Sequence, residues 1–123
     1  MTGREGRWIV RPTKKADKDF ADILYWTLRQ FGKAQATAYR QTIESALEAL
    51  QGGPTVPGIR RLDGVSGGLM TLHVARQGRK GRHLIVFRVA PNTDHPTLDI
   101  LRILHDAMDL PRHVPDTEDG SPV

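Results

Sequence analysis

A short apolar stretch near the start of the chain is followed by apolar and polar positions that repeat with the period of an α-helix. Residues 8–10 predict a first strand. Thr13 is a suitable N-cap for the helix that follows, because its side-chain oxygen can accept a free backbone N–H. Gly32 is suited to end that helix, since glycine adopts positive φ without strain. Apolar residues at helical spacing predict one buried stripe, made of Phe20, Ile23, Leu24, Thr27 and Phe31.

A second segment with helical periodicity spans residues 34–51 and ends at Gly52-Gly53-Pro54. Two amphipathic helices joined by so short a turn should lie side by side as an antiparallel hairpin. Their apolar stripes then need a third surface to cover them. The stripe of the second helix consists of Tyr39, Ile43, Ala46, Leu47 and Leu50.

The second half of the chain has the short apolar runs and the alternating apolar and polar positions that predict strands. After a Gly/Pro-rich loop at 55–68, residues 69–76 alternate apolar and polar positions, as a half-buried strand does. A glycine-containing turn at 77–81 leads into residues 83–89, whose unbroken apolar run predicts a central strand. Residues 98–104 form the last strand. The sequence therefore predicts an α+β fold of two layers: an N-terminal strand, a helical hairpin and three antiparallel strands, with the helices packed on one face of the sheet.

Composition and charge favour one small domain with an acidic tail. The chain of 123 residues has no cysteine, so we expect neither disulfides nor thiolate metal ligands. Its amino terminus lacks the apolar core of a secretory signal, and no apolar run is long enough to span a bilayer, so we expect a cytoplasmic protein. The net charge is +4, and three carboxylates in the last eight residues leave +7 on residues 1–115. We expect a domain over 1–115 and a disordered tail over 116–123.

Specific chemistry is harder to find. The short segment 76–82 contains four cationic side chains, Arg76, Arg79, Lys80 and Arg82. This positive charge could attract an acidic protein or the phosphates of a nucleic acid. The five histidines have no close pair at metal-ligand spacing, so we expect no metal and no cofactor. Trp26 falls off the buried stripe of the first helix, and an exposed tryptophan is often an interface anchor.

The run Ile100-Leu101-Arg102-Ile103-Leu104-His105, followed by Met108-Asp109 and Arg112-His113, resembles the carboxy-terminal signature of the ParE branch of the RelE/ParE superfamily of toxins from bacterial type II toxin–antitoxin systems. Gly68-Leu69, the segment 83–89 and Phe31-Gly32 are similar to other parts of that family. The turn at 77–82 is longer and more basic than in the shorter members. The resemblance implies a toxin that a ParD-like antitoxin with an acidic C-terminal segment neutralises in a hetero-oligomer. It implies DNA gyrase as the target in the ParE branch and ribosomal mRNA cleavage in the RelE branch.

A ribonuclease needs a base, an acid and cations around one phosphate, and the candidates here are His83, Arg88, Arg102 and His105. Strand alternation places Arg102 on the face of Leu98, Ile100 and Leu104 and puts His105 opposite, unless a bulge at Leu104 intervenes. No compact catalytic set matches the nuclease members residue by residue. We therefore favour a gyrase inhibitor that acts by protein contact, with no catalytic residue, and keep the RelE-like endoribonuclease as the alternative.

The expected contacts fall into two groups. Arg102 inside an apolar strand needs a carboxylate, either from within the chain or from an acidic antitoxin. We expect antitoxin contacts at Trp26, Arg88, Arg102 and Met108, and target contacts at Arg79, Lys80, Arg112 and His113. A plain nucleic-acid-binding domain that uses residues 76–82 is a third, weaker reading.

Overall fold

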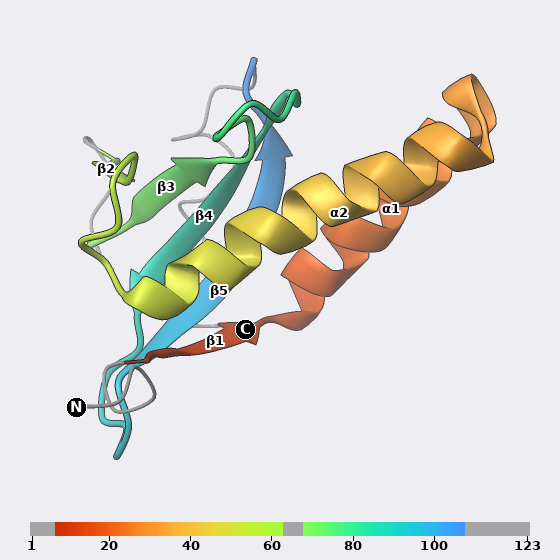
Figure 1. The fold of residues 1–123 in the computed structure, drawn as a ribbon. Helices are drawn as coiled ribbons and strands as arrows, with labels where there is room; N and C mark the ends of the chain where they lie inside the picture. Colours follow the sequence, from red (N-terminus) through yellow and green to blue (C-terminus); the bar gives the residue numbers. More distant parts are fainter. Residues whose placement is uncertain (1–6, 63–67, 108–123) are drawn as a thin grey trace.

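The computed structural model describes residues 7–62 and 68–107, so Met108, Arg112, His113 and the acidic tail at 116–123 lie outside the described part of the chain. Two helices cover one face of a five-stranded sheet (Figure 1). This confirms the predicted α+β arrangement in two layers. The elements in chain order are β1 (Ile9–Pro12), α1 (Lys14–Phe31), α2 (Lys33–Ala49), the short 3-10 helix η1 (Leu50–Gly52), β2 (Arg60–Arg61), β3 (Met70–His73), β4 (His83–Val89) and β5 (Thr97–His105).

The sheet has the strand order β1-β5-β4-β3-β2. β1 is parallel to β5, whereas the other neighbouring strands are antiparallel. β4 occupies the middle of the sheet, as its unbroken apolar run predicts. The two-residue strand β2, which pairs with β3, lies in the segment that the sequence predicts to be a loop.

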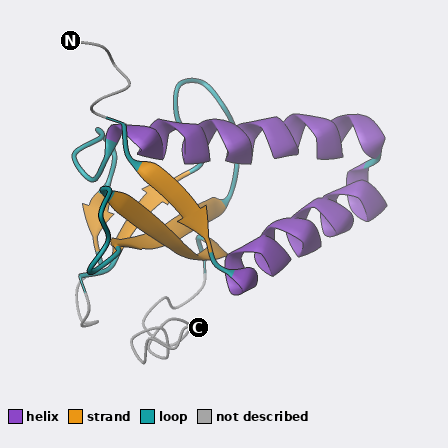
Figure 2. Ribbon diagram, turned by 90° about the horizontal axis from the view of Figure 1, so that it is seen from below, coloured by secondary structure: helices purple, strands orange, loops and turns teal. Residues whose placement is uncertain are grey.

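The helical hairpin begins and turns where the sequence predicts. The hydroxyl of Thr13 accepts the backbone N–H of Ala16 at 3.2 Å and so caps α1. Gly32, with φ of 94°, separates α1 from α2. The prediction that Phe31 is buried is wrong, since 61% of its surface is exposed. The tip of the hairpin extends past the sheet, so the last turn of α1 has no strand beneath it (Figures 1 and 2).

The main core lies between the helices and the sheet. Phe87, Ile85 and Leu72 of the sheet pack there with Ile43 and Leu50 of the second helical segment, all of them at most 1% exposed. A second cluster, composed only of loop and strand residues, covers the opposite face of the sheet. Its buried members are Leu69, Val86, Leu101 and Leu104.

A β-bulge in β5 changes which side chains face the helices. Val86 pairs with Arg102, but the next residue, Phe87, pairs with Ile100, so Leu101 is an extra residue in β5. Ile100 and Ile103 therefore both belong to the main core, although they are three residues apart. The predicted face shared by Arg102, Leu98 and Ile100 is wrong, because the bulge lies at Leu101.

Asp19 of α1 joins the helix to the part of β5 that β1 does not reach. Its carboxylate accepts two hydrogen bonds from the guanidinium of Arg102, at 2.8 and 3.0 Å, and one from the backbone N–H of Ile103 at 2.9 Å. Since β1 pairs with β5 only as far as Ile100, this N–H would otherwise lack a strand partner. The carboxylate thus substitutes for the missing strand.

We predict that Asp19→Ala lowers the free energy of unfolding by about 2–3 kcal/mol, because it leaves a mostly buried guanidinium and a backbone N–H without their acceptor. Urea denaturation measures this change. The matched control is Asp22→Ala, one turn further along α1, whose carboxylate pairs with Lys18 in the solvent. This control should unfold close to the wild type, and equal losses in both variants would contradict the role of Asp19.

Candidate protein-binding groove

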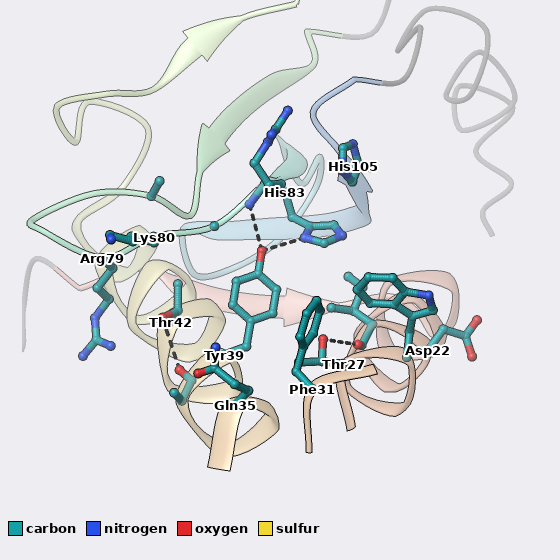
Figure 3. Close-up of a pocket in the computed structure, with 16 residues that line it drawn as sticks. Asp22, Thr27, Phe31, Gln35, Tyr39, Thr42, Arg79, Lys80, His83 and His105 are labelled. Carbon is teal, nitrogen blue, oxygen red and sulfur yellow. Dashed lines mark hydrogen bonds between the residues drawn. The ribbon is translucent and has the colours of Figure 1, made fainter. Parts of the chain in front are cut away.

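A groove of about 1120 Å³ lies between the two helices and the hairpin that joins β3 to β4. Figure 3 shows its walls, with side chains from α1 and α2 facing the start of β4 and the end of β5. The lining residues are Asp22, Ile23, Trp26, Thr27 and Phe31 of α1, Gln35, Ala38, Tyr39 and Thr42 of α2, Ala75 and Arg79–Arg82 of the hairpin, and His83 and His105 of the sheet.

The wall formed by α1 exposes two large aromatic side chains. The rings of Trp26 and Phe31 meet edge to face, with centroids 5.7 Å apart. Both rings are more than half exposed, at 57% and 61%. Exposed aromatic surface of this kind, set in a groove, is typical of sites where another protein binds. The predicted exposure of Trp26 is confirmed.

Tyr39 of α2 reaches across the groove to the base of the hairpin. Its hydroxyl accepts the backbone N–H of Arg82 at 3.0 Å and lies 2.6 Å from Nδ1 of His83. Gly81 makes this approach possible, because a Cβ atom there would lie 2.9 Å from the tyrosine hydroxyl. The tyrosine therefore fixes the hairpin as one wall of the groove.

The hydrogen bonds also determine the protonation of three histidine rings. The hydroxyl of Tyr39 accepts the backbone N–H of Arg82, and we assign its own proton to the bond with Nδ1 of His83, because a phenol O–H is a stronger hydrogen-bond donor than a neutral imidazole N–H. The backbone N–H of Ala107 donates to Nδ1 of His105 at 3.1 Å, and that of Ala75 donates to Nδ1 of His73 at 2.9 Å. In each ring Nδ1 is thus an acceptor, and the ring proton is on Nε2.

Asp106 uses one of these Nε2–H groups. Nε2 of His73 lies 2.9 Å from its carboxylate, and the guanidinium of Arg82 lies 3.2 Å from it. The hydrogen bond from His73 and then that from Arg82 lower the pKa of Asp106 to about 2. The carboxylate is 3.6 Å from Nδ1 of His105, too far for a hydrogen bond.

His83 and His105 each have a ring N–H that the described residues do not bind. Their ring centroids are 5.4 Å apart, and no hydrogen bond within 7–62 and 68–107 involves Nε2 of either ring. Burial, and then the neighbouring His105, lower the pKa of His83 to about 4, so it is neutral at pH 7. At the rim, Arg79 and Lys80 are exposed, and neither takes part in an ion pair among the described residues.

The predicted nuclease residues do not come together. Arg102 is bound by Asp19, so its carboxylate partner is internal. Arg88 lies 3.9 Å from Asp99, which also binds Arg11 at 2.8 Å. On the β4–β5 ladder, Arg88 is five residues from His83, the residue paired with His105, which corresponds to roughly 16 Å.

Sequence reasoning missed Tyr39 and Phe31 as groove residues. Tyr39 is part of the apolar stripe of α2, and nothing in that spacing indicates that its hydroxyl meets a strand 44 residues further on. Phe31 also fits the stripe of α1, and only the length of the hairpin relative to the sheet exposes it. Within the described residues there is no cluster of three metal-ligating side chains, and no helix is long and apolar enough to cross a membrane.

We predict that the free energy of unfolding falls as the pH is lowered from 6.5 to 4. The unfolded chain binds a proton at His83 near pH 6.5, whereas the folded chain resists protonation until about pH 4, so the unfolded state binds more protons in this window. Urea denaturation at a series of pH values measures the slope. His83→Asn should flatten it, whereas His95→Asn, in the exposed connection after β4, should keep it. An unchanged slope in His83→Asn would exclude His83 as its source.

The fold of this chain is similar to that of several solved structures. A chain of the chromosomal ParDE toxin–antitoxin system from P. aeruginosa superposes with a TM-score of 0.56 at 23% identity, over 81% of this chain and 97% of that chain. A chain from the RelBE2 toxin–antitoxin complex of Mycobacterium tuberculosis gives 0.52 at 21% identity, over 80% and 98%. A YoeB/ParE toxin from Agrobacterium tumefaciens gives 0.52 at 14% identity, over 79% and 96%. At these identities the likeness establishes the fold alone.

The sequence itself identifies the family. No curated protein matches the chain significantly. Residues 10–110, however, match the family model described as the ParE toxin of the type II toxin–antitoxin system parDE. That match covers both helices, β1 from its second residue, and the other strands of the sheet. It confirms the family predicted from the carboxy-terminal signature, and the chain therefore belongs to the ParE toxins of type II toxin–antitoxin systems.

Proposed function

We propose that this toxin inhibits DNA gyrase by protein contact and that a ParD-like antitoxin with an acidic C-terminal segment neutralises it. The observation that carries the proposal is the groove, which combines exposed aromatic rings with rim cations that form no ion pair within residues 7–62 and 68–107. Such a surface suits a protein segment that is both apolar and acidic. The solved ParDE and RelBE2 chains come from toxin–antitoxin systems, which supports an antitoxin as the partner here.

The antitoxin segment would lie along the groove as an amphipathic helix or an extended strand. Trp26 and Phe31 would receive its apolar side chains, and Arg79 and Lys80 would face its carboxylates. Arg88 and Arg102 would contact the antitoxin only by exchanging Asp99 or Asp19 for one of its carboxylates. Arg79 and Lys80 are also the proposed contacts to gyrase, so antitoxin and target would compete for the hairpin.

Two features of the groove favour binding over RNA cleavage. Arg88 and Arg102 are held in ion pairs with Asp99 and Asp19, so neither guanidinium is available to stabilise a phosphate beside His105. A general base must offer a lone pair, yet the Nδ1 atoms of His83 and His105 both already accept hydrogen bonds. Both rings offer an N–H instead, which can bind an anion but cannot take the proton of a 2′-hydroxyl.

We predict that the purified protein inhibits supercoiling of relaxed plasmid by DNA gyrase and does not cleave mRNA during translation. Agarose gels of plasmid topoisomers and primer extension on translated mRNA measure the two activities. His105→Ala serves as the discriminating variant. Cleavage by the wild type that this variant loses would contradict the proposal and favour the ribonuclease.

We predict that Trp26→Ala weakens binding of the antitoxin about tenfold or more and leaves the fold intact, because an exposed aromatic anchor contributes to binding rather than to the core. Titration calorimetry with the antitoxin encoded beside the toxin gene measures the affinity, and circular dichroism checks the fold. Leu28→Ala is the matched control, since Leu28 is 44% exposed on the same helix but does not line the groove. Equal affinities for wild type and Trp26→Ala would remove Trp26 from the interface.

A further inference from the structure

At the sheet end of the groove, two imidazole N–H groups have no hydrogen-bond partner among residues 7–62 and 68–107. Nδ1 of His83 accepts from Tyr39, and Nδ1 of His105 accepts from the backbone of Ala107. Each ring therefore carries its proton on Nε2, and no hydrogen bond among the described residues involves that atom. The rings are 5.4 Å apart at their centroids and both line the groove (Figure 3). Two N–H donors in one groove, on rings that contact each other, are a candidate receptor for an acceptor group.

The surroundings favour a carboxylate as that group. Arg79, Lys80 and Arg82 line the same groove on its hairpin side, which favours an anion over a neutral carbonyl. The positive charge at this end is limited, because Asp106 already pairs with Arg82. A phosphodiester chain is bound by a row of cations along a track, and the opposite wall of this groove instead carries aromatic rings and Asp22. A single carboxylate fits both the number of donors and the modest charge.

We propose that His83 and His105 form a carboxylate receptor, in which their Nε2–H groups bind an Asp or Glu side chain of the antitoxin segment while neighbouring apolar side chains of that segment pack on Trp26 and Phe31. This inference rests on the proposed function and adds the residues that read the segment. Tyr39 acts as the positioning residue, since its hydroxyl holds His83 with Nδ1 turned away from the ligand. The receptor also fixes the direction of the segment, with its acidic side chain toward the sheet and its apolar side chains toward the helix tip.

A pair of small ligands tests the receptor without the antitoxin. 4-Phenylbutyrate carries a ring and a carboxylate, and 4-phenylbutyramide is its uncharged counterpart. Titration of the full-length protein at pH 7.5, followed by long-range ¹H–¹⁵N NMR of the histidine rings, reports both affinity and the state of Nε2. We expect the carboxylate to bind at least about fivefold more tightly than the amide, with shifts centred on Nε2 of His83 and His105. Equal binding of the two ligands would overturn the receptor.

Two substitutions of the half-exposed His105 separate the donor from the ring. His105→Leu should remove the preference for the carboxylate, whereas His105→Gln, which places an amide N–H near the position of Nε2, should retain most of it. Circular dichroism checks that both variants fold. A preference that survives His105→Leu, or that Gln fails to restore, would assign binding to the rim cations and overturn the proposal.

The remaining outcomes distinguish this inference from the proposed function. Displacement of phenylbutyrate by a single-stranded RNA decamer, lost in His105→Leu, would overturn the carboxylate assignment in favour of a phosphodiester. Loss of the charge preference in a protein that still binds its antitoxin through Trp26 would overturn only the receptor. A clear preference in a protein to which no antitoxin binds would support the receptor and overturn the proposed partner.

Discussion

The contact between the Asp19 carboxylate and β5 determines how the helical layer sits on the sheet. β1 ends at Pro12, and α1 begins two residues later. On this edge β5 therefore has no pairing with β1 beyond Ile100. Beyond that point, side chains supply the hydrogen bonds. The hydroxyl of Thr13 donates to the carbonyl of Ile100, and the carboxylate of Asp19 accepts from the N–H of Ile103 and from Arg102. One end of α1 is thereby attached to the sheet. The last turn at the other end, which closes with Phe31, projects beyond the sheet.

The bulge at Leu101 connects this attachment to the groove. Without the extra residue, the alternation along β5 would place Ile103 and His105 on the face away from the helices. With it, Ile103 enters the main core, and His105 comes to lie beside His83 at the end of the groove. The bulge at Leu101 thus places His105 in the groove, where a partner can reach it, whereas Arg102 pairs with Asp19 within the fold.

Local signals predicted the parts of the fold that depend on neighbouring residues. The cap at Thr13, the break at Gly32 and the central position of β4 follow from residue type and spacing over a few positions. The Asp19–Arg102 pair, separated by 83 residues, and the bulge left no such trace, because any carboxylate on α1 could have been the partner. The groove could not be predicted either, because its walls come from segments that are far apart in the sequence. Trp26 could be predicted to be exposed, but the wall opposite it comes from a hairpin and a tyrosine that only the tertiary structure brings together.

The projecting tip of the helical hairpin implies a gradient of local stability along α1. Its first half is held by Thr13, Asp19 and the core, whereas its last turn, which carries the exposed Phe31, extends past the sheet. Segments with few buried contacts open at the lowest free energy, so amide hydrogens near the tip should exchange with solvent long before those near Asp19. The end of the aromatic wall near Phe31 can therefore change its shape at a lower free-energy cost than the half of α1 near Asp19, so one sheet could accommodate antitoxin segments of more than one sequence.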